Sequence, residues 1–433
     1  MNLRKKVKTN CINYGVSMRL YPTQRQKALI KKHFAAVRSV WNFHLNQRQE
    51  LWEAARYTIN YYEQCKDLTV EKTTEEHKWW NEVSSKALQS ALQNLDNAFV
   101  RFFKRQANFP RFKHKGEKKA FSSPNYLNGN KMVIRIEGNK IIFQKFKEGI
   151  KFRSGKIPEN IKSITVYEKN GKIYASCICE GNKPKIIPTG KAIGIDLGIK
   201  NLVACSDGTI YDKYKIDKKK EKKLKRYQRI MARRQPAKEA KASNRYNAIK
   251  LKYGKLMAKI VSGRKDHIHK ITSEIVKNND VICMENLKVK EMQKKPTLKK
   301  FHLTKHLANA SFHEVRRQIE YKAKWHSKEI KFVDVDFSSS KICHECGYIN
   351  NDLKLRQRNW VCPNCNAKLH RDVNASINIL NECLNFNTAG NAEIKGRGVL
   401  EQANGQPLGS NETMSRQLAS ARVHNCENFK REG

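Results

Sequence analysis

Long apolar runs and acidic residues are both scarce in this 433-residue chain. No apolar segment approaches the ~18 residues that a membrane-spanning helix requires, and no apolar core follows the basic segment Met1–Asn10, as a secretory signal would need. We therefore expect a cytoplasmic protein with no membrane partner. The 40 Asp and Glu residues face 87 Lys and Arg residues, which gives a net charge of +47. Such a polycation predicts a polyanionic partner, and nucleic acid is the leading candidate.

Four of the twelve cysteines form two Cys-x2-Cys pairs near the C-terminus. Fifteen residues separate the pairs, which is the spacing of a zinc ribbon. His344 and His370 are not assigned as ligands, because their positions break the symmetry of the pairs. A catalytic zinc is the less favoured alternative. We expect one structural zinc ion held by four thiolates, from Cys343, Cys346, Cys362 and Cys365.

The N-terminal half shows helical signals followed by strand signals. A capping box, Thr23-Gln24-Arg25-Gln26, opens a helix, and apolar residues at helical spacing make residues 23–106 a helical region. Beyond residue 120, Asn170-Gly171 separates two strand patterns and predicts a hairpin. We expect a small barrel or a curled sheet there.

The C-terminal half alternates strands and helices, which predicts an α/β sheet. Buried strands end at Asp196 and at Glu285. A very basic helical stretch runs from about Lys218 to Lys277 with a break near Pro236. A helix over 303–327 and a strand over 330–335 precede the cysteine pairs, and a helix from Asp372 to about residue 383 follows them.

Three carboxylates occupy related places in this pattern: Asp196, Glu285 and Asp372. Strand ends meet at one edge of a sheet, so these residues can share a site. Carboxylate oxygens suit two Mg²⁺ or Mn²⁺ ions, which can hydrolyse a phosphodiester. Taken singly, each has a plainer interpretation: a turn residue, an exposed strand end and a helix N-cap. The segment Ile195–Gly198 also resembles the phosphate loop of actin-like ATPases. Their order, with the ribbon before the third, favours the metal site.

Basic and aromatic residues supply candidate nucleic-acid contacts. The helix of 218–234 has few acidic partners, which favours phosphate contact over a merely solvated face. The segment Phe109–Lys113 could bind a backbone and stack bases, or it could be a loop that closes the helical domain. The individual candidates are Arg111, Lys113, Arg264, Lys265 and His267.

Five sequence pieces together resemble the TnpB family, the RNA-guided nucleases of bacterial insertion sequences, and through it the compact type V CRISPR effectors. They extend from residue 20 to about residue 380. The pieces are Leu20-Tyr21-Pro22-Thr23-x-x-Gln26, Gly194-Ile195-Asp196-Leu197-Gly198, Met284-Glu285-Asn286-Leu287, the cysteine pairs, and Arg371-Asp372-x-Asn374-Ala375.

The resemblance implies an α/β multidomain protein. Its parts are a RNase H-like (RuvC) nuclease domain with an inserted zinc ribbon, an N-terminal wedge β-barrel and a helical recognition domain. The implied boundaries are 1–22 and 120–185 for the barrel, 23–119 for the recognition domain, 190–340 and 372–385 for the nuclease domain, 341–371 for the ribbon, and 386–433 for a tail that we expect to be disordered.

The resemblance also implies an activity. Asp196, Glu285 and Asp372 would be the acidic triad of a DNA endonuclease that holds two Mg²⁺ (or Mn²⁺) ions. The partners would be a guide RNA from the transposon end and double-stranded DNA beside a short transposon-adjacent motif. Cutting would help to keep or restore the element at its donor site. We expect a monomer with RNA, associated with the nucleoid when bound to DNA.

The motif contact is expected from Gln89 and Gln93, since Gln pairs with adenine edges. Two alternatives stay open. One is an RNA-guided or direct DNA-binding repressor, and the other is a transposase that both cuts and joins DNA.

Overall fold

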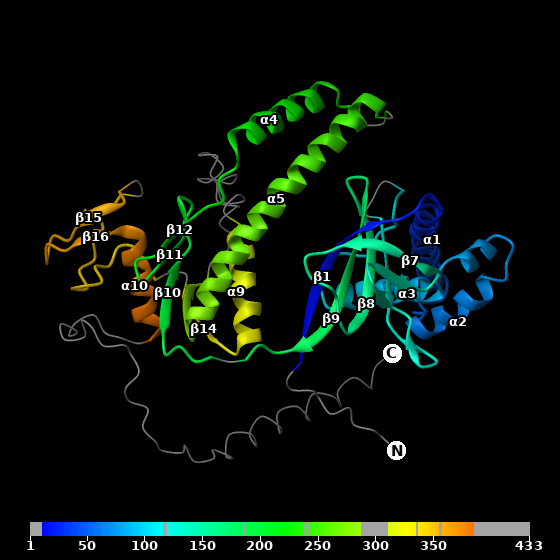
Figure 1. The fold of residues 1–433 in the computed structure, drawn as a ribbon, viewed down its shortest axis with the longest axis horizontal. Coiled ribbons are helices and arrows are strands. Elements are labelled where there is room, and N and C mark those ends of the chain that lie inside the picture. The colour runs from blue at the N-terminus through cyan, green and yellow to red at the C-terminus, as the bar shows by residue number, and fades with distance from the viewer. Residues whose placement is uncertain are drawn as a thin grey trace, which may run out of the picture. The chain divides into compact units, whose positions relative to one another are not determined.

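The computed structural model describes residues 11–384 except 116–118, 186, 238–239, 241, 287–310, 335–336 and 355–356. Its described residues divide into two compact units. The first unit contains the N-terminal helices, a large antiparallel sheet and three basic helices, and the second contains a mixed sheet, its covering helix and the cysteine pairs (Figure 1). Across the described ranges, no helix is both long and apolar enough to cross a membrane.

Local capping fixes where the helices of the first unit begin. Thr23 accepts a bond from Gln26 N at 3.3 Å, and Gln26 Oε1 accepts from Thr23 N at 3.0 Å, so the predicted capping box is confirmed. Asn60 and Ser84 cap the next two α-helices. The elements of this region are α1 (Gln24–Ala55), α2 (Tyr61–Glu71), the 3₁₀ helix η1 (Lys78–Glu82) and α3 (Ser85–Phe103).

The sheet of the first unit has seven antiparallel strands in the order β2-β8-β9-β1-β7-β6-β5. The N-terminal strand lies between β9 and β7, so it shares one sheet with residues 120–182. Asn170 and Gly171 have φ values of 52° and 72°, which confirms the predicted β8–β9 hairpin. The strands are β1 (Cys11–Tyr21), β2 (Ala120–Pro124), β5 (Arg135–Glu137), β6 (Lys140–Phe143), β7 (Phe146–Arg153), β8 (Ile161–Lys169) and β9 (Lys172–Asn182).

One hydrophobic core joins this sheet to α1 and α3. Met18 of β1, Ile30 of α1 and Leu88 of α3 are buried in the same cluster. His33 lies there as a neutral ring, because its burial lowers its pKa to about 4. Its Nε2 accepts from the main-chain N–H of Ser84 at 3.1 Å. The ring therefore ties α1 to the start of α3.

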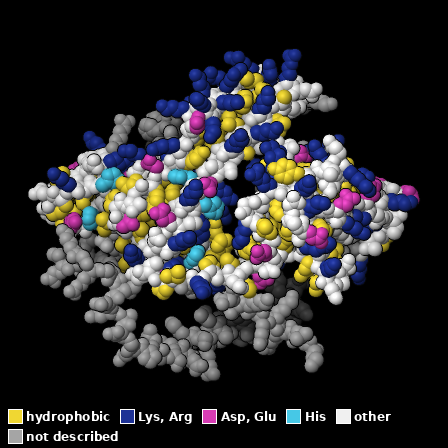
Figure 2. All heavy atoms as spheres, viewed as in Figure 1, with side chains coloured by type: hydrophobic (Ala, Val, Ile, Leu, Met, Phe, Trp, Pro, Cys, Tyr) yellow, Lys and Arg dark blue, Asp and Glu magenta, His cyan; other side chains and the backbone are white. Residues whose placement is uncertain are grey.

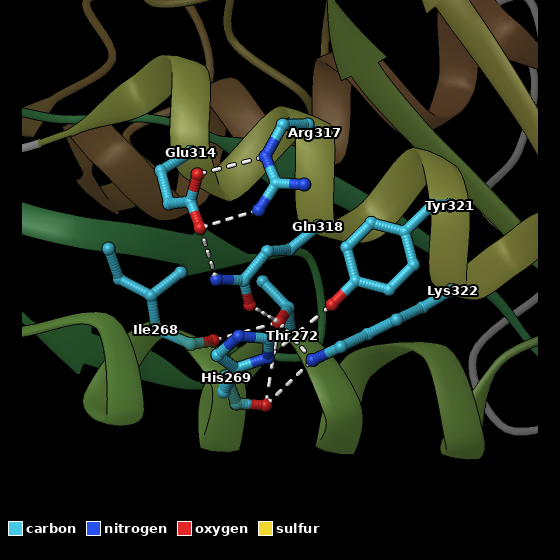
Figure 3. A network of polar contacts seen from close by, with 8 residues as sticks. All are labelled: Ile268, His269, Thr272, Glu314, Arg317, Gln318, Tyr321 and Lys322. Carbon is cyan, nitrogen blue, oxygen red and sulfur yellow. Dashed lines mark hydrogen bonds and ion pairs between the residues drawn. The ribbon is translucent and has the colours of Figure 1, made fainter. Parts of the chain in front are cut away.

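Three further helices belong mainly to the first unit: α4 (Lys218–Arg233), α5 (Asn244–Asn278) and α9 (Phe312–His326). Buried polar groups join α5 to α9 (Figure 3). Lys322 Nζ donates to Thr272 Oγ1 at 2.6 Å and to the carbonyl of His269 at 2.8 Å, and Thr272 donates to Gln318 at 2.9 Å. Burial lowers the pKa of Lys322 to about 8. The helix expected over 303–327 is described from Phe312 onward.

The sheet of the second unit has five strands in the order β12-β11-β10-β13-β14. The strands β10 (Ala192–Asp196), β13 (Val281–Glu285) and β14 (Glu329–Val333) are parallel to one another, and β11 (Asn201–Cys205) and β12 (Ile210–Asp212) continue the sheet beyond β10. Helix α10 (Arg371–Cys383) packs on this sheet. A Cβ at Gly194 would lie 2.0 Å from the carbonyl oxygen of Ser376. Glycine therefore allows β10 and α10 to touch.

The cysteine pairs lie in a small subdomain between β14 and α10. It contains a two-stranded hairpin of β15 (Asn359–Val361) and β16 (Lys368–His370). Its core consists of Leu353, Trp360 and Leu369, packed behind the cysteines. Residues 386–433, expected to be disordered, lie outside the described residues.

Candidate functional site

Two of the predicted carboxylates end neighbouring parallel strands. Ile195 of β10 pairs with Met284 of β13, so Asp196 and Glu285 follow in register at the carboxyl edge of the sheet. Asp372 lies in the first turn of α10, which packs on both strands, and it is 5% exposed. The structure therefore brings together three residues that are far apart in the sequence.

Asp372 is not the N-cap of its helix, so that interpretation is wrong. The cap is His370, whose side chain accepts from Val373 N. Both carboxylate oxygens of Asp372 are engaged: Oδ1 accepts from Arg358 at 2.6 Å and Oδ2 from Asn201 at 3.2 Å. Glu285 Oε1 accepts from Ser339 Oγ at 2.7 Å. The site is thus a built arrangement of hydrogen-bonded carboxylates.

The negative charges of these three carboxylates favour the binding of a cation. Burial, followed by the charges of Glu285 and Asp372, raises the pKa of Asp196 to about 7, although Arg371 and Arg358 oppose the rise. Burial also raises the pKa of Glu285, partly offset by the bond from Ser339. Like charges collected in a half-buried place cost free energy unless a proton or a metal ion neutralises them. The donor set therefore fits hard divalent cations.

The four paired cysteines form a closed metal-ligand group. Their sulfur atoms all lie within 4.8 Å of one another, and two of the separations are 3.7 Å (Cys343–Cys365) and 3.6 Å (Cys346–Cys362). Tetrahedral zinc with Zn–S bonds of about 2.3 Å requires sulfurs about 3.8 Å apart. Within the described residues, the three carboxylates do not all approach one another this closely.

The two cysteine turns repeat one hydrogen-bond pattern. Gly347 N donates to Cys343 O at 2.8 Å, and Asn366 N donates to Cys362 O at 2.9 Å. Gly347 and Asn366 both have positive φ values, 77° and 60°. His344 Nδ1 lies 2.9 Å from Asn374 Oδ1, so this ring is engaged away from the sulfur group. The geometry fits a four-thiolate zinc site.

The candidate nucleic-acid contacts lie on different elements of the structure. Gln89 and Gln93 line a groove of about 400 Å³ between α3 and β2, together with Lys86 and Ser122. Arg264, Lys265 and His267 lie on α5, where Arg264 and His267 are half-buried and Lys265 is exposed. Every residue of α4 is exposed or half-buried, and Figure 2 shows its Lys and Arg side chains gathered on the surface.

The segment around Arg111 is docked on α1. Trp41 Nε1 donates to Arg111 O at 3.0 Å, and Asn42 exchanges two hydrogen bonds with the main chain of Lys113. Lys113 Nζ lies 3.4 Å from the centre of the Trp41 ring, and Phe109 packs edge-on against Phe99. These contacts favour a loop that closes the helical domain, while the Arg111 side chain stays exposed.

Sequence reasoning missed three residues that contact the carboxylates: Asn201, Ser339 and Arg358. None belongs to a recognisable motif, and each reaches the site from a different segment. The only signal for Arg358 was its position between the cysteine pairs, directly before β15 (Asn359–Val361).

Family profiles match three parts of the chain. A profile described as "Cas12f1-like, TNB domain" matches residues 312–379, "Probable transposase" matches 175–295, and "Helix-turn-helix domain" matches 12–56. In this structure, residues 12–56 form one strand and one long helix.

Full-length relatives are also similar. A "Putative RNA-guided DNA endonuclease" of Streptomyces pristinaespiralis is 32% identical and covers 84% of this chain and 87% of its own length. The "Putative RNA-guided DNA endonuclease InsQ" of Escherichia coli K12 is 29% identical and covers 83% of this chain and 90% of its own. Cas12f1, in a solved complex with sgRNA and target DNA, is 14% identical and covers 86% of this chain and 99% of its own, with a TM-score of 0.51.

The fold is similar to that of the Cas12f1 effector, and the cysteine group lies within the residues that the Cas12f1-like profile matches. The chain belongs to the TnpB family, alongside relatives named "Putative RNA-guided DNA endonuclease" and "TnpB-like protein".

Proposed function

We propose that the protein is an RNA-guided endonuclease that hydrolyses double-stranded DNA next to a short transposon-adjacent motif. The observation that carries the proposal is the meeting of Asp196, Glu285 and Asp372 at one sheet edge, in a chain of net charge +47. Family membership supports the guide RNA and the DNA target, since the relatives bear that activity in their names.

The five-stranded sheet with α10 would be the RuvC-type nuclease domain. Its three carboxylates would hold Mg²⁺ or Mn²⁺, and two such ions would activate a water and neutralise the leaving oxygen. Arg358 and Asn201 orient Asp372, and Ser339 orients Glu285.

The cationic surface would hold the nucleic acids through their backbones. Helix α4 carries nine Lys and Arg residues against one acidic residue, Glu221, which pairs with Lys225. Base pairing with a guide supplies sequence specificity, so protein contacts can be made with phosphates alone. We assign the guide to an RNA from the transposon end and expect one protein copy per RNA.

The groove beside α3 would read the adjacent motif. Gln89 is half-buried and Gln93 is exposed, and both face the groove together with serine hydroxyls. Glutamine pairs with the N6 and N7 edge of adenine. Alanine at both positions is expected to change the motif preference in a randomised-flank cleavage assay, and an unchanged preference would remove them from this role.

One experiment separates this function from its rivals. The protein is purified from cells that carry its native locus, and the co-purified RNA is sequenced and used for cleavage. A discrete RNA from the gene's 3′ flank and free DNA ends support the proposal. Joined DNA strands would indicate a transposase, and guided binding without scission by the wild-type protein would indicate a repressor.

The ribbon zinc would be structural, because four thiolates leave no open coordination position. Chelation of zinc is expected to expose residues 341–370 to hydrogen exchange, while β10 and β13 keep their protection. Retained protection of the ribbon after complete zinc removal would contradict this assignment.

A further inference from the structure

Two buried asparagines lie one turn apart on α10, the helix that carries Asp372. Asn374 is 1% exposed and Asn378 is 2% exposed. Amide groups at such depth are unfavourable unless hydrogen bonds satisfy them. Their partners are therefore informative, and all of them lie in one short segment, Ser339–His344, at the start of the ribbon.

The amide nitrogens of both residues bind carbonyls of that segment. Asn374 Nδ2 donates to Ile342 O at 2.7 Å, and Asn378 Nδ2 donates to the same oxygen at 2.7 Å and to Ser339 O at 2.8 Å. Asn374 Oδ1 in turn accepts from His344 N at 3.1 Å. The chain between these contacts includes Cys343, the first zinc ligand.

Asn378 gives up an acceptor to make its bonds. Its Oδ1 is buried without a hydrogen-bond partner in the described structure. A reversed amide would place this oxygen against two carbonyl oxygens, so the donor orientation is the one that chemistry allows. A buried unsatisfied acceptor is unfavourable. The two donated hydrogen bonds must therefore contribute enough free energy to offset it.

The segment that the asparagines hold also touches the carboxylates. Ser339, whose carbonyl binds Asn378, donates its hydroxyl to Glu285 at 2.7 Å. The far end of the ribbon meets the same helix, since Arg371 N donates to Arg358 O at 2.7 Å and Arg358 binds Asp372. The ribbon and the residues that lead into it therefore contact two of the three carboxylates, Glu285 and Asp372, and the asparagines fix this region to the helix that carries Asp372.

We propose that Asn374 and Asn378 are positioning residues that fasten the first zinc knuckle to α10, so that the ribbon sets the placement of Glu285 and Asp372 for divalent-metal binding. This inference rests on the proposed nuclease function. It makes the ribbon part of the metal site's supporting structure, and it assigns no contact with metal or DNA to either asparagine.

The test measures Mn²⁺ binding by electron paramagnetic resonance on the zinc-loaded protein without nucleic acid, with Asp196→Ala as the background. Asn374→Ala and Asn378→Ala are expected to weaken Mn²⁺ binding about ten- to a hundredfold, as loss of such supporting partners does elsewhere. The Mg²⁺ concentration for half-maximal cleavage should rise in parallel, while guide-RNA affinity stays unchanged. The matched control is Asn381→Ala, a half-buried asparagine of the same helix, which should change nothing.

Zinc content and circular dichroism of each variant are measured first. If an asparagine variant loses its zinc or unfolds, Mn²⁺ binding is measured on Ser339→Ala instead. This variant removes only the hydroxyl that donates to Glu285, at the end of the same chain of contacts. Mn²⁺ affinity within twofold of wild type in folded variants would overturn the inference. If wild-type protein binds Mn²⁺ no better than Asp196→Ala, the proposed function fails rather than the inference alone.

Discussion

The two ends of strand β13 place carboxylates in opposite electrostatic situations. At the amino end, Asp280 accepts main-chain bonds from Thr189 and Gly190, both at 2.7 Å, and pairs with Lys328. At the carboxyl end, Glu285 lies in register beside Asp196, whose carboxylate is repelled by both Glu285 and Asp372.

These surroundings move the pKa values in opposite directions. Partial burial alone would raise the pKa of Asp280, but Lys328 and the two N–H groups lower it to about 2. At the carboxyl end, burial raises the pKa of Glu285, and burial together with the charges of Glu285 and Asp372 raises the pKa of Asp196, which ends the neighbouring strand β10, to about 7. The amino end of β13 thus stabilises the fold, and the carboxyl end contributes to a repulsion between like charges that a bound cation would relieve.

The largest expected effect is the loss of cleavage in Asp196→Ala. Metal ions contribute several kcal/mol of transition-state stabilisation, so guided cleavage should fall by about a thousandfold or more. Binding of guide and target, measured by gel shift, should remain, because α4 and the groove are untouched. Cleavage within tenfold of wild type would remove Asp196 from the metal site.

Removing the Asp280 carboxylate at the amino end of β13 should instead lower the free energy of unfolding. Asp280→Ala removes the carboxylate that pairs with Lys328 and accepts from Thr189 and Gly190, and losing hydrogen bonds to a charged group costs about 1.5–3 kcal/mol. Chemical denaturation should show the loss. In the protein that remains folded, the Mg²⁺ dependence of cleavage should match wild type, and a shifted Mg²⁺ dependence would show that the two ends are coupled.

Acidification should weaken divalent-metal binding before it unfolds the protein. The carboxylates must be ionised to hold the cation, so protons compete below the pKa of Asp196, about 7. The Mg²⁺ concentration for half-maximal cleavage should rise up to about tenfold per pH unit below pH 7 if one proton is displaced. Guide binding measured across the same pH range is the control, and a flat Mg²⁺ requirement from pH 8 to 6 would contradict this prediction.

The smallest expected effect is a gain of stability. The folded pKa of Asp196 is raised, so its favourable contribution is present at low pH and is lost as pH rises through about 7. Asp196→Asn should therefore raise the melting temperature of the metal-free protein at pH 8, by about 2–4 °C for each kcal/mol relieved. The matched Asp280→Asn should lower it. A lower melting temperature for Asp196→Asn would show that the repulsion is already relieved.

The sequence was sufficient where the information is local or periodic. The capping box at Thr23, the hairpin at Asn170-Gly171 and the strands that end in Asp196 and Glu285 are visible in short windows, and the parallel register then places both carboxylates at one edge. The residues that orient them were not predictable, because Arg358, Asn201 and Ser339 arrive from separate segments whose meeting depends on tertiary packing. The close approach at Gly194 is equally invisible in sequence, since it depends on the carbonyl of Ser376.

The two cysteine turns have one further consequence. They reach the same main-chain geometry with different residues, Gly347 in one and Asn366 in the other, and each turn needs only a permissive residue directly after its second cysteine. Homologues can therefore diverge at nearly every other position of the turns and still place four sulfurs at tetrahedral separations. In distant relatives, cysteine spacing should remain a usable landmark for alignment after overall identity has become uninformative.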